Sequence, residues 1–356
     1  MNIEELFTTM VEKRASHVHL VPGSPIMMRI NNQLESMDGQ ILSPQDTQAF
    51  SDAIMTDQLH DEFDDHMEVD FSFSVPGLSR FRVNVFRQRG SVAVIISTNP
   101  PAPPSLEELG IPDSIKNIVT DSGSGLVIVC GPKQCGKSST MAALINCILA
   151  ERTCQIISIE DPIDFLYKNN KGVICQREIG TDVMTYKEAF AALKHQSADV
   201  VFISGMDNYE TMSNAIELAA AGTFVLATST AQNVQSMIEK IIDSYPPHLS
   251  QSVRNHLAEG LKAVIGQIML TKADGSGMVP AFELLLGTQQ CKQILKDNKV
   301  FQIHALMAAG AREHGMQTIE MALRSLVKKN IVTMDEAMRA CGNSEEFKKI
   351  MSLSLG

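Results

Sequence analysis

Positive charge is scarce in this sequence, in which 30 Lys and Arg residues stand against 41 Asp and Glu residues and give a formal net charge of −11. A protein that binds a nucleic-acid backbone needs a basic face to displace counterions from the phosphates. We therefore expect no nucleic-acid partner, and the charge balance disfavours a helicase.

Long apolar runs, a basic leader and paired cysteines are also missing. No apolar run approaches the roughly 18 residues of a membrane-spanning helix, and the first ten residues, MNIEELFTTM, lack the basic start of a signal peptide. The seven cysteines include no CxxC pair, which suits a reducing compartment and gives no zinc-ligand spacing. We expect a cytoplasmic protein without direct membrane insertion.

The sequence has ordinary globular composition, with 44% apolar and 20% charged residues over a length of 356 residues. Its clearest motif is GPKQCGKSST, at residues 131–140, which follows the strand-like run GLVIVC. The GxxxxGK[ST] spacing between a strand and a helix is typical of a phosphate-binding loop, in which glycines let backbone N–H groups gather around the anion. A lysine reaches the phosphates, and the following hydroxyl binds Mg²⁺. We therefore predict a site for ATP and Mg²⁺ formed by Gly131, Gly136, Lys137, Ser138 (also the Mg²⁺ ligand) and Ser139.

Strands that alternate with helices follow this loop. The helix directly after it carries apolar residues at the spacing of one buried face: Met141, Leu144, Ile145, Ile148 and Leu149. The next strand-like runs are CQIISIEDPID, DVVFISG and TFVLATS, with helical segments at 186–196 and 210–220. This alternation predicts an α/β fold with a parallel sheet covered on both faces. The carboxyl ends of such strands carry the chemistry, and here they hold Glu160, Asp161 and Asp164.

Residues 1–99 are predicted to form a separate small α/β domain. It has helices at 4–13 and near 44–57, a hairpin of HVHLV and PIMMRINNQL turning at Pro22–Gly23, and three further strands broken at Pro76–Gly77 and Arg89–Gly90. Residues 100–112, PPAPPSLEELGIP, predict a stiff, extended linker. The second domain, 113–356, is expected to be mainly helical from Pro247, with one short hairpin region around 267–286.

The middle strand of the last three in the first domain contains several arginines among apolar residues: Arg80, Arg82, Arg87 and Arg89. One interpretation is a solvated sheet face, because charged residues usually face water. The other is an arginine face that docks on a neighbouring subunit's nucleotide, since guanidinium groups clamp phosphates.

The chain resembles the PilT/PilU family of type IV pilus retraction ATPases, a branch of the secretion ATPases. The resemblance covers nearly the whole length and rests on ASHVHL, FRVNVFRQRG, GPKQCGKSST, IEDPIDF, CQREIG, YETMSNAIELAAAG, IIDSYP, ELLLGT and GMQTIEMAL. It implies an N-terminal PAS-like domain joined to a RecA-like ATPase domain, in a hexameric ring with nucleotide between subunits. It also implies that Glu160 and Asp161 help arrange Mg²⁺ and water, Glu160 through a water, and that Arg82, Arg87 or Arg89 reach a neighbour's phosphates.

The sequence departs from the family where the catalytic glutamate is expected. The family pattern Gly-Glu-Met-Arg-Asp is replaced by residues 204–208, SGMDN, so that Gly205 stands at the glutamate position. That carboxylate orients and deprotonates the attacking water, a role worth about 10²–10⁴ in rate. Asp207 lies about 6–7 Å further along an extended chain and would need a rearranged loop to replace it. Asp199 lies at the amino end of the strand.

Other family positions are changed as well. Thr223 and Thr230 occupy the two histidine positions of the family's histidine box, and Ser97 stands where an arginine is expected. In the loop, Lys133 and Gln134 replace a common Thr-Gly pair, which would cost about 1 kcal/mol if Gln134 needs a left-handed backbone. We expect these changed positions to face one nucleotide together. We therefore predict that the chain binds ATP without turning it over efficiently.

Three hypotheses remain open. The first is an ATP-binding ring protein that assists pilus retraction and twitching motility and hydrolyses ATP weakly or not at all. Its ring contains copies of this chain alone or also a hydrolysing PilT paralogue. The second is a fully active retraction ATPase in which Asp207 or Glu160 serves as the base. The third is a nucleotide-sensing scaffold at the pilus base. In each, we expect membrane contact to be indirect, through the pilus platform protein at the inner face of the cytoplasmic membrane, because no basic amphipathic helix is visible.

Overall fold

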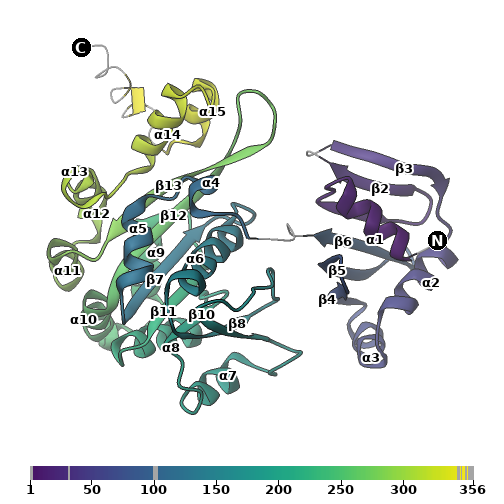
Figure 1. Ribbon diagram of the computed structural model, residues 1–356, viewed down its shortest axis with the longest axis horizontal. Coiled ribbons are helices and arrows are strands. Elements are labelled where there is room, and N and C mark those ends of the chain that lie inside the picture. Colours follow the sequence, from purple (N-terminus) through teal and green to yellow (C-terminus); the bar gives the residue numbers. More distant parts are fainter. Residues whose placement is uncertain are drawn as a thin grey trace. The chain divides into compact units, whose positions relative to one another are not determined.

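The computed structural model describes residues 3–30, 33–98, 103–342, 345, 347, 348 and 351. The chain divides into two compact units, Met1–Ala102 with Pro162–Phe165, and Pro103–Asp161 with Leu166–Gly356 (Figure 1). Residues 100–102 of the predicted linker lie outside the described residues. Further along that segment, Leu106–Leu109 forms helix α4, whose leucines pack against the core of the second unit.

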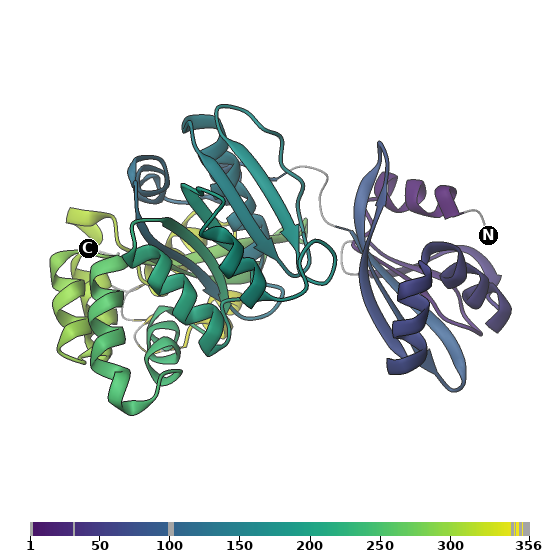
Figure 2. The ribbon, with the colours of Figure 1, turned by 90° about the horizontal axis from the view of Figure 1, so that it is seen from below.

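The first unit is an antiparallel sheet with helices packed against it. Its described strands have the order β3-β2-β1-β6-β5-β4. The elements are α1 (Ile3–Glu12), β1 (His17–Leu20), β2 (Pro25–Ile30), β3 (Gln33–Ile41), α2 (Pro44–Ile54), α3 (Asp57–His66), β4 (Glu68–Val75), β5 (Ser79–Gln88) and β6 (Ser91–Thr98). Helices α1 and α2 lie on the same face of the sheet (Figure 2). Phe7 of α1 packs on Phe81 of β5 with ring centroids 4.4 Å apart, so aromatic contacts join the two layers.

Two local predictions for this unit were wrong in detail. The helix expected near 44–57 is α2, which ends at Ile54, and a further helix that was not predicted, α3, begins at Asp57 after the Thr56 hydroxyl accepts a hydrogen bond from the Leu59 N–H. The run PIMMRINNQL is not one strand: β2 ends at Ile30 and β3 begins at Gln33, antiparallel to it. The turn between β5 and β6 is the predicted one, with positive φ at both Arg89 and Gly90.

The second unit is built on a mostly parallel sheet with the order β13-β12-β7-β11-β10-β8-β9 among its described residues. Its strands are β7 (Gly125–Gly131), β8 (Gln155–Glu160), β9 (Val173–Glu178), β10 (Val200–Ile203), β11 (Phe224–Thr230), β12 (Leu261–Thr271) and β13 (Met278–Leu286). Its α-helices are α4, α5 (Asp113–Asp121), α6 (Lys137–Glu151), α7 (Tyr186–Leu193), α8 (Tyr209–Ala220), α9 (Val234–Asp243), α10 (Ser250–Gly260), α11 (Gln289–Lys296), α12 (Ile303–Ala309), α13 (Ala311–His314), α14 (Ile319–Lys328) and α15 (Met334–Ala340). Short 3₁₀ helices occur at Pro247–Leu249 and Val300–Gln302.

The centre of this sheet confirms the predicted parallel α/β arrangement. Every residue of β7 is buried, as expected for a strand covered on both faces, and β7 pairs in parallel with β11 and β12. The apolar face of α6 is fully buried against it. The carboxyl ends of β7, β11, β10 and β8 therefore meet at one edge of the sheet, which is where the phosphate-binding motif lies.

The C-terminal part of the sheet differs from the prediction. The hairpin predicted around 267–286 is present, since β12 and β13 pair in antiparallel fashion up to Thr271 and Met278. It is not short, however: its strands have 11 and 9 residues, and β12 pairs with β7 and so extends the central sheet. β9 has no counterpart among the predicted strands; it is an edge strand with no continuous apolar run. Among the described residues, none of the helices combines the length and the apolar character needed to span a bilayer.

Candidate nucleotide site

The motif at residues 131–140 forms a loop between β7 and α6 in which both glycines are required by packing. A Cβ atom on Gly131 would lie 2.3 Å from the Gln267 carbonyl oxygen and 2.5 Å from the Cys135 sulfur. Gly136 has a φ of +87°, and a Cβ there would lie 2.8 Å from the Met269 methyl group. Only glycine fits these two positions without displacing its neighbours.

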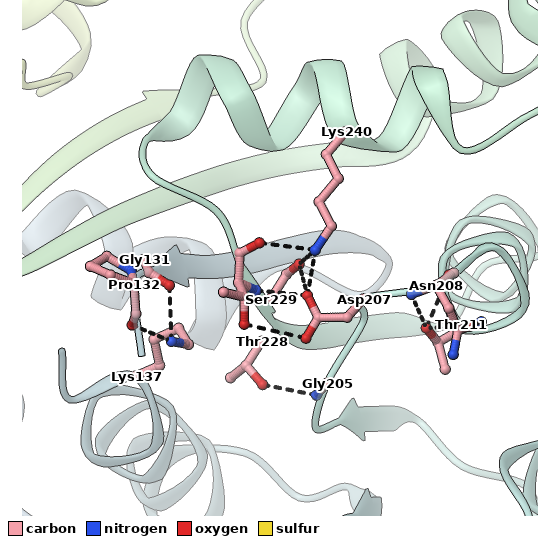
Figure 3. A network of polar contacts seen from close by, with 11 residues as sticks. Gly131, Pro132, Lys137, Gly205, Asp207, Asn208, Thr211, Thr228, Ser229 and Lys240 are labelled. Atoms are coloured by element: carbon pink, nitrogen blue, oxygen red, sulfur yellow. Dashed lines mark hydrogen bonds and ion pairs between the residues drawn. The ribbon is translucent and has the colours of Figure 1, made fainter. Parts of the chain in front are cut away.

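The amino terminus of α6 presents the features of an anion site. Gly136 is its N-cap and provides no side-chain hydrogen bond, so the N–H groups of the first turn have no capping side chain. Ser138 and Ser139 are partly exposed in that turn. Lys137 Nζ donates to the carbonyl oxygens of Gly131, at 3.0 Å, and Pro132, at 2.7 Å (Figure 3). These groups fit the phosphates of a nucleotide, which would replace carbonyl oxygens as the partners of the lysine.

Gln134 stands in a backbone conformation that suits glycine better. Its φ is +64°, in the left-handed region that L-residues with a Cβ adopt at a cost of about 1–2 kcal/mol. Gln134 therefore does adopt the left-handed backbone for which the sequence analysis expected a cost.

Gln267 supports the loop from β12 and was missed by sequence analysis. Its side chain is buried, donates through Nε2 to the Cys135 carbonyl oxygen at 2.6 Å and accepts at Oε1 from the Thr140 hydroxyl at 2.7 Å. One amide thus ties the loop and the first turn of α6 to the neighbouring strand. No local pattern marks a contact between residues 127 positions apart, so only the sheet pairing reveals it.

Glu160 ends β8 at the same edge of the sheet as the loop. It is buried, and its Oε1 accepts hydrogen bonds from the Ser158 hydroxyl at 2.6 Å and from Gln176 Nε2 at 3.1 Å. Asp161 follows it and is exposed. Carboxylate and hydroxyl oxygens suit Mg²⁺, which keeps several waters, so Ser138 and Glu160 are chemically compatible with a water-mediated Mg²⁺ site.

Gly205 lies just beyond β10 and adopts a φ of +80°. Its N–H donates to the Thr228 hydroxyl at 3.1 Å, and the next N–H, of Met206, donates to the Thr228 carbonyl at 2.7 Å. A Cβ atom there would make an ordinary contact, 3.6 Å from the Tyr186 hydroxyl. The missing glutamate is therefore accompanied by a backbone that favours glycine.

Asp207, the acid nearest to Gly205 in sequence, is held by other groups (Figure 3). Its Oδ1 accepts from Lys240 Nζ at 2.5 Å, from the Ser229 hydroxyl at 2.9 Å and from the Thr230 N–H at 2.8 Å. Burial raises the pKa of Asp207, but the hydrogen bonds from Lys240, Thr230 and Ser229 outweigh it, and the pKa lies below its ordinary value. A carboxylate with occupied oxygens and a lowered pKa is a poor proton acceptor.

Tyr186 is another polar side chain beside Gly205. Its hydroxyl donates to the Ser204 carbonyl oxygen. Burial, and then the negative charges of Asp161, Asp207 and Glu160, raise the pKa of Tyr186 well above its ordinary value. The phenol is therefore neutral at physiological pH and cannot act as a base.

The remaining substituted positions do not all gather around this loop. Thr230 does, because it pairs with Gly131 across β11 and β7. Thr223 precedes β11, and its carbonyl oxygen accepts from the Gly125 N–H, so it lies at the opposite edge of the sheet. Ser97 belongs to the first unit, on β6. The expectation that the altered positions form one set around a nucleotide is therefore wrong for Thr223 within this unit.

The predicted arginines lie on or beside β5 of the first unit. Arg82 forms a bidentate pair with Asp70, with Nε 2.9 Å from Oδ1, and is half exposed. The Arg87 guanidinium lies 5.3 Å from the Phe63 ring centroid and 3.8 Å from Asp64. Arg89 is exposed at the turn. Arg82 and Arg87 are thus paired with acids at the surface of their own unit.

Comparisons with known proteins identify the family. A profile described as Type II/IV secretion system protein matches residues 1–350. The type IV pilus retraction ATPase PilT of Pseudomonas aeruginosa is 32% identical over 98% of this chain and all of its own length, and PilU of the same organism is 31% identical over 99% of this chain and 92% of its own. A crystal structure of the pilus retraction motor PilT with bound ADP is similar over 98% of this chain and 99% of that one, with a TM-score of 0.89 and 33% identity. The predicted α/β fold, with an N-terminal domain and a RecA-like ATPase domain, is confirmed, and the chain belongs to the PilT/PilU branch of the type II/IV secretion system proteins.

Proposed function

We propose that this chain is an ATP-binding protein of type IV pilus retraction whose own hydrolysis of ATP is weak or absent. The observation that carries the proposal is the pairing of a complete phosphate-binding loop with Gly205, at a φ of +80°, in place of the catalytic glutamate. The retraction role is supported by the names of the relatives, which are a retraction ATPase, PilU and a twitching motility protein.

The proposed weak hydrolysis is argued from two polar side chains near Gly205, neither of which suits the role of the base. Asp207 is held by Lys240 and has a lowered pKa, and Tyr186 is neutral. Loss of general-base catalysis removes about 10²–10⁴ in rate. Glu160 remains as an acid, but its Oε1 already accepts two hydrogen bonds.

Nucleotide binding rests on groups that need no glutamate. The first-turn N–H groups of α6 and Lys137 receive the phosphates, Ser138 binds Mg²⁺, and Glu160 holds it through water. In an assembled ring, made of this chain alone or with a hydrolysing PilT paralogue, Arg82, Arg87 or Arg89 reaches a neighbour's phosphates. Arg82 must then give up or share Asp70, since that carboxylate already occupies its fork. The ring acts in the cytoplasm against the pilus platform protein.

The test is nucleotide binding and steady-state ATP hydrolysis by the purified full-length chain with Mg²⁺. We expect tight binding that Lys137→Ala abolishes, with negligible turnover. Because Gly205 has a positive φ, a Gly205→Glu variant carries backbone strain of about 1–2 kcal/mol in addition to its new carboxylate. Gly205→Ala carries the same strain without the carboxylate and is the matched control. We expect Gly205→Glu to hydrolyse at least about tenfold faster than Gly205→Ala.

Rapid wild-type turnover that disappears in Lys137→Ala would overturn the weak-hydrolysis proposal. Glu160→Gln and Asp207→Asn variants would then show which acid serves as the base. The retraction role is tested separately, in cells deleted for this chain. Pilus retraction restored by the wild type but not by Lys137→Ala supports it, whereas normal retraction in the deletion contradicts it.

A further inference from the structure

A cavity of about 400 Å³ lies in the second unit, apart from the first turn of α6. Its walls come from the start of α9 and the residues before it, from β12 and β13, from helices α12 and α14, and from the end of α15 with Gly342. The volume is within the roughly 300–1,000 Å³ of pockets that hold small ligands. Gln267, which supports the phosphate-binding loop, lines one wall, but no residue of the loop or of α6 does.

The cavity is lined by two buried acids and, among the described residues, by no lysine or arginine. Glu283 of β13 and Glu320 of α14 are only 6% and 5% exposed. Within the described part of the chain, Glu283 accepts one hydrogen bond, at Oε1 from the Val234 N–H. Glu320 pairs through Oε2 with His304 Nε2 at 3.1 Å. Buried carboxylates normally have more partners than this.

We propose that this cavity binds an alkylguanidinium group between Glu283 and Glu320. A guanidinium carries five N–H donors in a plane, matches carboxylate oxygens in pairs and is more weakly hydrated than an ammonium group, so it suits a desolvated acidic site. The alkyl stem has apolar wall to contact, at Met307 and Ile319. The same chemistry is carried by a small free guanidine compound and by an arginine side chain of a polypeptide.

The raised pKa of Glu283 is consistent with an acidic cavity that lacks a positive charge. Burial raises the pKa of Glu283 to about 7, and the charge of Glu320 adds to the rise, while the Val234 N–H and His304 oppose it. The titratable groups that face Glu283 are Glu320 on α14, His304 on α12 and Cys130 on β7. A bound guanidinium takes the place of the proton, so its affinity should rise about tenfold from pH 6 to pH 8 as Glu283 ionises.

The experiment titrates the full-length chain with propylguanidinium and follows binding by ligand-observed NMR at pH 6, 7 and 8. The neutral isostere propylurea is the ligand control. Glu283→Gln and Glu320→Gln keep the shape of the cavity and should each lower the affinity at least about tenfold. Glu210→Gln, an exposed acid on α8, should leave it unchanged. Thermal unfolding checks that each variant is folded.

Saturable binding of propylguanidinium that depends on Glu283 and Glu320 supports the proposal. Equal binding of propylurea, equal binding by the Gln variants, or no binding would overturn it. A further arm separates the two sources. If N-acetyl-arginine methylamide binds as well as propylguanidinium, the site accepts an arginine within a polypeptide, and if the capped residue is excluded, the site holds a small free cation.

Discussion

The acid Glu283 gives a stability prediction whose magnitude follows from its burial. Its pKa rises from an ordinary 4.5 to about 7 in the folded chain. Between these two values the folded form keeps the proton and the unfolded form has lost it, so stability falls as pH rises through this window. At about 1.4 kcal/mol per pH unit, the loss amounts to roughly 3 kcal/mol above pH 7. Glu283→Gln removes the ionisation and can still accept from the Val234 N–H.

Differential scanning calorimetry of wild type and Glu283→Gln from pH 5 to pH 8 measures this effect. It also avoids dependence on tryptophan fluorescence, since the sequence has no tryptophan. We expect similar melting temperatures near pH 5 and a variant that melts about 6–12 °C higher at pH 8, in the transition of the second unit. Glu210→Gln is the matched control and should follow the wild type throughout. Parallel curves for wild type and Glu283→Gln would refute the reasoning, because they would mean that Glu283 titrates alike in both states.

Three further substitutions test the site. Gln134→Gly should stabilise the chain by about 1 kcal/mol, because glycine adopts the left-handed backbone without strain; a lower melting temperature would contradict this. Gln267→Leu should cost about 2–4 kcal/mol and weaken nucleotide binding, since it leaves a buried hydroxyl and a loop carbonyl unpaired; unchanged affinity would show that the loop does not need this support. Lys240→Met should cost about 1 kcal/mol in chemical unfolding at pH 7, while Lys240→Arg retains the pair with Asp207, and equal losses in both would argue against the ion pair.

Most of the second unit could be predicted because its signals are local. The strand before the loop, the spacing of α6 and the alternation of strands with helices are each visible within about 15 residues. The length and place of β12 and β13 were not visible in this way. Their pairing joins Leu261 and its neighbours to Leu126 and its neighbours in β7, and sequence periodicity does not encode such distant partners.

The site was predictable to the same extent. The glycines, Lys137 and Ser138 follow from one motif, and Gly205 stands out only against a family pattern. The roles of Lys240 and Gln267 depend on side chains of different elements that meet 33 and 127 residues from their partners, so no spacing rule could find them. The prediction that Asp207 could replace the missing glutamate only through a rearranged loop lacked one fact, the ion pair with Lys240 that occupies Asp207.

The backbone at Gly205 bears on how this chain can change over generations. Two of the four glycine codons, GGA and GGG, differ from a glutamate codon by a single nucleotide, so from those codons the missing carboxylate is one mutation away. That mutation would place a side chain at a φ of +80° and cost about 1–2 kcal/mol, a sizeable part of the 5–15 kcal/mol that keeps a typical protein folded. Once this loop conformation is present, a return to glutamate at position 205 is disfavoured by its cost in stability unless a second substitution first relaxes the backbone. The loss of the carboxylate is then harder to reverse than it was to acquire.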